Sequence, residues 1–163
     1  MYGGGIRVPG IVRWPGHVKP GTENDQPIIG SDIFTTICDV MDIPLPQDRT
    51  IDGASLLPAF EHEPIDRKIP MYWRFIIAKG PITAMRVGDW KIRSNEALST
   101  VEMYNSKDDT QEQNELSKAH PEKFQEMQQK FRKLNAQIEA EGPDWWRGYL
   151  RPGKKKQKPA KKS

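Results

Sequence analysis

A long amphipathic segment near the C-terminal end constrains this sequence most. Residues 121–141 carry apolar side chains at steps of three and four, and Gly142-Pro143 follows them. This spacing places the apolar side chains on one side of an α-helix, and Pro121 is well tolerated in a first turn. The pattern therefore predicts a helix over 121–141 with a narrow apolar stripe that needs a packing partner. The stripe consists of Phe124, Met127, Phe131, Leu134 and Ile138.

The residues before this helix predict the surface on which it packs. Short runs rich in β-branched and aromatic residues, separated by turn residues, are typical of strands in an antiparallel sheet. Gly88-Asp89 lies between two of these runs and predicts a hairpin. The expected unit is a small antiparallel sheet covered by the long helix. Its strands are expected at 70–77, 82–87, 90–93 and 101–104.

The first 67 residues have a different pattern. Gly and Pro interrupt residues 2–22 every few positions, which favours one short strand near Ile11 and Val12 between turns. A helix is predicted over 31–42, with Ser31 as its N-cap, because apolar residues again recur at steps of three and four. An irregular connection with a turn at Asp52-Gly53 follows. The apolar residues of the helix are Ile33, Phe34, Ile37, Val40 and Met41.

Charge is distributed unevenly along the 163 residues, whose net charge is +3. Residues 151–163 contain one Arg, six Lys and no acid, so residues 1–150 carry a net charge of −4. A lysine-rich tail can contact phosphates non-specifically, and a solvated, disordered tail is the simpler interpretation. The acidic body has no recognition module, so we do not expect a nucleic-acid partner. No apolar run is long enough for a membrane span, and no secretory signal is visible in this chain.

Patterns of catalytic and metal-binding residues are sparse. The single cysteine, Cys38, excludes an internal disulfide, and the three histidines lie far apart. Asp108-Asp109 could form a metal-type carboxylate pair, but a solvated loop is the simpler interpretation of this polar turn. Glu61-His62-Glu63 lacks a second histidine at helical spacing. The sequence therefore predicts no catalytic residue and no metal ligand in this chain.

Short motifs along residues 2–121 resemble, in order, the C-terminal half of a type I sulfatase of the arylsulfatase-like, alkaline-phosphatase-like superfamily. The family pattern Y-E-G-G-x-R-x-P, followed by W-P-G, is matched by Tyr2, Gly4, Gly5, Arg7, Pro9, Trp14, Pro15 and Gly16. Later matches are Asp32, Thr36, Asp52, Gly53, Leu56, Leu57, Pro58, Arg86, Gly88, Trp90, Lys91, Met103, Tyr104, Asp109, Glu112, Asn114 and Leu116. The sequence departs from the family at Gly3, Ser106 and Thr110, where glutamate, leucine and proline are usual.

The resemblance implies an α/β protein, present here as an α+β fragment with three parts. Residues 1–67 would complete a large α/β domain, residues 68–150 would form a small C-terminal subdomain, and residues 151–163 would be a basic, disordered tail. Complete relatives hydrolyse sulfate esters with a formylglycine nucleophile and calcium, and both sites lie upstream of this portion. Cys38 is not that nucleophile, because it is followed by Asp39-Val40 rather than by the C-x-P-S/A-R pattern.

By resemblance, three residues are candidates for the substrate side of the active site. Arg7 would orient a carboxylate or pack the turn, and Trp73 and Arg74 would face substrate or pack within a strand. We expect this chain alone to bind neither cofactor, to be inactive and to be marginally stable. A sulfate-ester substrate is expected only with an N-terminal half. The alternatives are a non-catalytic interaction protein or split-enzyme subunit, or non-specific nucleic-acid binding through the lysine-rich tail. Complete relatives are generally exported, periplasmic or lysosomal; localisation and oligomeric state stay open.

Overall fold

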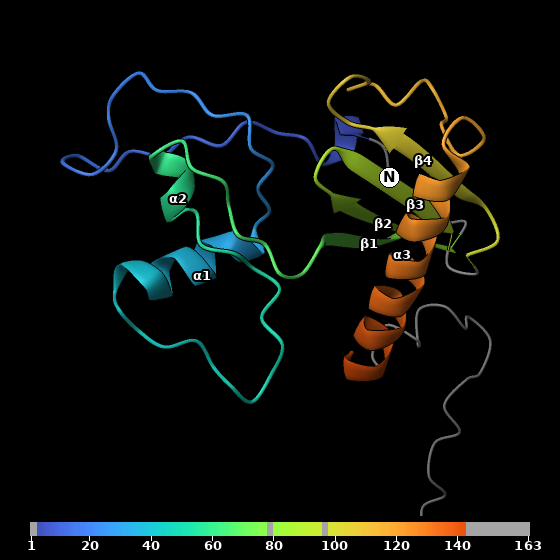
Figure 1. Ribbon diagram of the computed structural model, residues 1–163. Coiled ribbons are helices and arrows are strands. Elements are labelled where there is room, and N and C mark those ends of the chain that lie inside the picture. The colour runs from blue at the N-terminus through green and yellow to red at the C-terminus, as the bar shows by residue number, and fades with distance from the viewer. Residues whose placement is uncertain (1–2, 78–79, 96–97, 143–163) are drawn as a thin grey trace, which may run out of the picture.

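The computed structural model describes residues 3–77, 80–95 and 98–142 (Figure 1). An N-terminal part with little regular structure carries two short helices, and a C-terminal part combines a sheet with a long helix. The mixed α and β composition and the sheet covered by a helix confirm the predicted fold class. The predicted tail at 151–163 and the end of the second part at 143–150 lie outside the described residues, so the predicted domain boundaries stay a prediction.

The sheet has four antiparallel strands in the order β1-β2-β3-β4. Each strand pairs with its neighbour in sequence, and the predicted hairpin at Gly88 is confirmed, with Gly88 at a φ of +57°. Only a residue without a Cβ adopts that left-handed conformation at no steric cost. All four predicted strands are therefore present, with small shifts at their ends. They are β1 Met71–Ile77, β2 Gly80–Val87, β3 Trp90–Asn95 and β4 Val101–Asn105.

Helix α3, Pro121–Glu141, has the bounds that the sequence predicts and lies across one face of the sheet (Figure 1). Phe131 and Met127 of its apolar stripe have no exposed surface. They form the main core with sheet residues that the strand register places on the same face. The sheet members of this core are Met85, Ile92 and Met103.

Helix α1, Ser31–Val40, confirms the predicted helix but not its predicted cap. Gly30 occupies the N-cap position, and no side chain caps the helix. The carboxylate of Asp32 instead accepts a hydrogen bond from the backbone N–H of Ile29, at 2.8 Å. Ser31 was therefore wrongly predicted as the N-cap, because Asp32, one residue later, binds the backbone that precedes the helix.

The apolar face of α1 points away from the rest of the chain. Ile33, Phe34, Ile37, Val40 and Met41 are 42–63% exposed, although their spacing is typical of a buried face. The buried residues of the helix are instead Asp32, Thr35 and Cys38.

The connection after α1 approaches this helix at Gly53. A Cβ at Gly53 would clash with the backbone oxygen of Ser31 and the hydroxyl of Thr35. The turn predicted at Asp52-Gly53 is therefore wrong, because the chain runs there without a turn and the glycine permits a close approach. A short helix that the sequence did not predict, α2 Leu57–Phe60, follows.

The strand predicted near Ile11 and Val12 is also absent from the structure. Residues 6–14 have extended or irregular backbone, and a three-residue 3-10 helix, η1 Gly3–Gly5, precedes them. Ile11 is 93% exposed and Val8 77%. A strand requires a hydrogen-bonded neighbour, and the described part of the chain provides none beside these residues.

Candidate functional site

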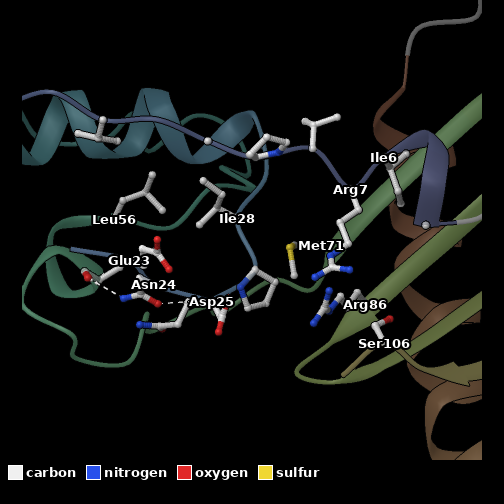
Figure 2. Close-up of a pocket in the computed structure, with 18 of the residues that line it drawn as sticks. Ile6, Arg7, Glu23, Asn24, Asp25, Ile28, Leu56, Met71, Arg86 and Ser106 are labelled. Carbon is white, nitrogen blue, oxygen red and sulfur yellow. Dashed lines mark hydrogen bonds between the residues drawn. The ribbon is translucent and has the colours of Figure 1, made fainter. Parts of the chain in front are cut away.

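A cavity of about 770 Å³ lies between the N-terminal part and the sheet (Figure 2). Its walls come from residues 3–12 and 22–28, from α2 and from the sheet face opposite α3. The polar and aromatic side chains that line it include Arg7, Glu23, Asp25, His62, Trp73, Arg86, Lys91, Ser106 and Glu112.

The sheet supplies its residues to the cavity by strand alternation. Successive side chains on a strand point to opposite faces, so Met71 and Trp73 face the cavity while Tyr72 faces α3. Arg86 pairs with Met71 across β1 and β2, and Lys91 pairs with Arg86 across β2 and β3. The register therefore places these side chains in one row across three strands.

A buried ion pair lies at the end of this row. The Nζ of Lys91 is 2.6 Å from Oε1 of Glu112, and both side chains are at most 3% exposed. Burial lowers the pKa of Lys91, and the hydrogen bond and negative charge of Glu112 oppose that change. The second carboxylate oxygen of Glu112 is buried without a hydrogen-bond partner. Glu112 itself has a φ of +55° in the loop after β4.

The turn that carries Arg7 rests on this ion pair. A Cβ at Gly3 would lie 3.2 Å from Oε1 of Glu112 and 3.1 Å from the backbone oxygen of Thr110. The backbone oxygen of Gly3 accepts hydrogen bonds from the N–H groups of Ile6, at 3.0 Å, and Arg7, at 2.7 Å. The buried pair thus supports the turn, and the turn fixes the backbone of Arg7.

Two arginines meet inside the cavity. The side chains of Arg7 and Arg86 point toward one another from the N-terminal turn and from β2 (Figure 2). Burial lowers the pKa of Arg86, and the positive charge of Arg7 lowers it further, while Asp89 and Glu112 act in the opposite direction. The Nε of Arg86 donates to the backbone oxygen of Gly88 at 2.7 Å, which fixes the guanidinium on the strand.

A second buried charge pair anchors α1. Arg67 donates two hydrogen bonds to the carboxylate of Asp32, at 2.8 and 2.6 Å, and the Asp32 side chain has no exposed surface. The same carboxylate accepts from the N–H groups of Ile29 and Ala54. Burial raises the pKa of Asp32, but the hydrogen bonds from Arg67 and these backbone groups outweigh it, so that its pKa lies below its usual value.

The structure separates the three candidate substrate residues. Arg7 and Trp73 line the cavity, and Trp73 is half-buried. Arg74 lies on the opposite face of the sheet, 3.4 Å from Glu139 of α3. The difference follows from strand alternation, because neighbours in a strand cannot face the same side.

The sequence did not predict Arg86, Lys91 and Glu112 as site residues. All three match the family motifs, but residues in separate strands and loops meet only through the sheet register. The one sequence signal that could have indicated these site residues was that all three match the family motifs.

The glycines, prolines and tryptophans of the family motifs lie in turns, in ring-packing contacts or along the cavity wall. Trp14 stacks on His17 with ring centroids 4.1 Å apart and meets Phe60 edge-on. Trp90, the first residue of β3, meets His120 edge-on at 5.3 Å. Gly4 and Gly5 lie in η1, and Gly16 has a φ of +82°. Pro9 lines the cavity, Pro15 follows Trp14, and Gly53 lies against α1.

The described residues do not fit a calcium site. Within 3–77, 80–95 and 98–142, no group of three or more His, Cys, Asp or Glu side chains could hold a metal ion. Asp109 accepts hydrogen bonds from Asn114, and Asp108 accepts one from Asn105, so both carboxylates serve the loop after β4. Among the helices of the same ranges, none is long and apolar enough to cross a membrane.

The fold and the sequence both match sulfatases. Human steryl-sulfatase is 50% identical over 58 residues, which are 36% of this chain and 10% of that protein. N-acetylgalactosamine-6-sulfatase of Sus scrofa is 39% identical over 75 residues, 45% of this chain and 14% of that protein. A solved structure described as a complex with its substrate D-glucosamine-2-N,6-O-disulfate has a TM-score of 0.53 and 26% identity. The match covers 70% of this chain and 25% of the chain in that structure.

A family model described as N-sulphoglucosamine sulphohydrolase, C-terminal, matches residues 1–141. The chain therefore belongs to this sulfatase family and corresponds to its C-terminal portion. The matches span between a tenth and a quarter of the length of these relatives. The resemblance seen in the motifs is confirmed.

Proposed function

We propose that this chain forms the C-terminal part of a sulfuric ester hydrolase of the arylsulfatase-like kind. In this proposal the cavity wall carrying Arg7, Trp73 and Arg86 faces the sulfate ester, and an N-terminal portion completes the active site. That portion supplies the formylglycine nucleophile and calcium, whose chemistry is attack on the sulfuryl group and neutralisation of its oxygens. The family match over residues 1–141 supports the proposal.

One observation carries the requirement for a second portion: α1 exposes its apolar face. Five large apolar side chains at helical spacing are 42–63% exposed, while the polar Asp32 and Thr35 are buried. A helix normally buries its apolar stripe, and contiguous exposed apolar surface marks an interaction site. The occupant expected on this face is the large α/β domain of the sulfatase. Val8 and Ile11, in the same N-terminal part, are also strongly exposed apolar residues.

The chain's own residues have binding and orienting roles in this scheme. The positive charges of Arg7 and Arg86 attract an anionic substrate to the cavity. Trp73 offers an aromatic surface for the ring that bears the ester. None of these groups replaces the nucleophile, so the 163-residue chain alone is expected to be inactive.

The test compares the chain with its complete assembly. The purified 163-residue protein is assayed with 4-methylumbelliferyl sulfate, with and without calcium, and the expected turnover equals that of the blank. The protein isolated from its source with an antibody against α3 is then assayed in the same way. We expect hydrolysis there, together with a formylglycine peptide detected by mass spectrometry in the same polypeptide or complex. Turnover by the chain alone, or neither activity nor formylglycine in the isolated assembly, would contradict the proposal.

The catalytic portion can reside in the same polypeptide or in a separate subunit. Reading the nucleotide sequence upstream of the Met1 codon for C-x-P-S/A-R in an uninterrupted frame distinguishes the two arrangements. A continuous frame supports one polypeptide, and a separate gene for that portion supports a split enzyme.

A further inference from the structure

The arginine end of the cavity contains two positive charges, and no ion pair among the described residues involves either of them. Among the described residues, no hydrogen bond or ion pair holds the guanidinium of Arg7. Arg86 uses its Nε for the backbone oxygen of Gly88, and its side chain points toward Arg7 in the cavity (Figure 2). Arg7 is exposed and Arg86 is half-buried. Their like charges repel each other, so an anion placed between them is stabilised by both.

Nearby carboxylates do not fill this position. Glu112 is engaged by Lys91 at 2.6 Å, within a buried pair, and serves to support the turn below Arg7. The negative charge of Asp89 raises the pKa of Arg86, but the two side chains form no ion pair in the described part of the chain. Glu23 and Asp25 line the cavity from residues 22–28 (Figure 2). Their negative charge disfavours an anion near that wall and so restricts it to the arginine end.

The guanidinium of Arg86 and the backbone of Arg7 are held in place before any ligand binds. Arg86 stands on β2 between the paired strands β1 and β3, and its Nε hydrogen bond limits rotation of the guanidinium. The backbone of Arg7 is fixed by its N–H bond to Gly3, which rests on the buried Lys91–Glu112 pair. The fixed guanidinium of Arg86 loses less side-chain entropy on binding than a free surface arginine does.

We propose that Arg7 and Arg86 together form a binding site for an oxyanion, a carboxylate or sulfate group that is distinct from the ester being cleaved. Guanidinium groups match the planar fork of a carboxylate and the oxygens of sulfate, and a hydrogen bond to a charged group is stronger than a neutral one. The anion can be a second acidic substituent of the substrate or a carboxylate of the docked catalytic portion. The assignment to substrate rests on the proposed function, whereas the anion site itself does not.

The first experiment measures anion binding without any reaction. Inorganic sulfate is titrated into the 163-residue protein by isothermal titration calorimetry at constant ionic strength, with chloride as the reference salt. Arg7→Gln and Arg86→Gln are each expected to weaken sulfate binding roughly tenfold or more. Arg13→Gln is the matched control, because Arg13 is an exposed arginine that does not line the cavity. Equal binding by all four proteins would overturn the proposal, as would absence of binding by the unchanged protein.

The second experiment distinguishes the two sources of the anion in the complete sulfatase. Steady-state kinetics compare phenyl sulfate with 4-carboxyphenyl sulfate, which differs by one carboxylate. If the substrate provides the anion, Arg7→Gln raises KM for the carboxylated ester alone. If the catalytic portion provides it, Arg7→Gln weakens association of the two portions and affects both esters equally. Kinetics and association identical to those of Arg13→Gln would contradict either source. Sulfate binding with no sulfatase activity would retain the anion site and reject the proposed function.

Discussion

Helices α1 and α3 have the same apolar periodicity but bury opposite faces. In α3 the apolar stripe is covered by the sheet, and Met127 and Phe131 have no exposed surface. In α1 the apolar stripe faces solvent, while Asp32, with no exposed surface, is bound by Arg67. The C-terminal part therefore contains its own core, and the N-terminal part is held by polar anchors to the chain that follows it. The difference supports the proposal that a further portion of the sulfatase covers the apolar face of α1.

The largest expected effect comes from the core of the C-terminal part. Phe131→Ala removes a fully buried aromatic ring and is expected to lower the free energy of unfolding by about 3–5 kcal/mol. Phe34→Ala on α1 is the matched control. Its side chain is 48% exposed, so we expect a change within about 0.5 kcal/mol. Urea denaturation followed by circular dichroism measures both, and equal losses would remove the contrast between the two helices.

The next effect concerns the anchor of α1. Asp32→Asn breaks the buried pair with Arg67 and leaves a cation without its partner, which costs about 3 kcal/mol. The loss is expected locally, as faster hydrogen exchange over residues 29–54, with little change over residues 121–141. Asp48→Asn, which alters an exposed pair with Arg49, is the control and is expected to change neither region. Faster exchange throughout α3 would show that the two parts do not behave separately.

The Asp32–Arg67 pair should also make the local stability of residues 29–54 depend on pH. Its hydrogen bonds hold the folded pKa of Asp32 below the ordinary value of about 3.9, so its contribution to stability is fully present above that unfolded value. It is lost as the pH falls through the lower folded value, because the unfolded chain then binds the proton more readily. Exchange over residues 29–54 should accelerate below pH 4 in the unchanged protein, after correction for intrinsic exchange rates. In Asp32→Asn this acceleration should disappear; its persistence would assign it to other carboxylates.

A smaller effect is expected from the packing of the connection on α1. Gly53→Ala places a methyl group against the backbone of Ser31 and the hydroxyl of Thr35, at a cost of about 1–3 kcal/mol. Gly4→Ala is the matched control, because no atom lies within 4 Å of a Cβ built there. Proteolysis between α1 and α2 reports the local loosening. Equal cleavage of both variants would mean that the close approach at Gly53 is not required.

The smallest effect is expected on the solvent side of α3. Glu126 pairs with Lys123 at 2.8 Å and Lys130 at 2.7 Å, and all three side chains are at least one-third exposed. Glu126→Gln should lower the free energy of unfolding only slightly, because exposed ion pairs are screened by solvent, and added salt should reduce the difference further. A loss as large as that of Phe131→Ala would contradict the assignment of stability to the core.

The sequence predicted elements whose causes are local. Periodicity and flanking residues gave the bounds of α3, and Gly88-Asp89 gave the hairpin. It did not predict that α1 would expose Phe34 and bury Asp32, because periodicity reports that a face packs but not which polypeptide covers it. The strand expected near Ile11 failed for the same reason, since strand pairing is non-local.

The candidate site was predicted only in part. Arg7 and Trp73 line the cavity, but Arg74 lies on the other face, as alternation requires. The meeting of Arg86 with Arg7, and of Lys91 with Glu112, depends on strand register and on a loop conformation with positive φ at Glu112. These determinants become visible only when distant segments are placed together.

Hydrogen exchange of this chain with and without the sulfatase's catalytic portion tests the central claim most directly. The account predicts that amides of α1 and of residues 6–13 exchange rapidly in the isolated 163-residue protein and slow strongly in the assembly. Amides at the centre of α3 and β3 should exchange at similar rates in both states, because their core lies within this chain. Equal protection of α1 in both states would show that its apolar face needs no second portion, and the account would be contradicted.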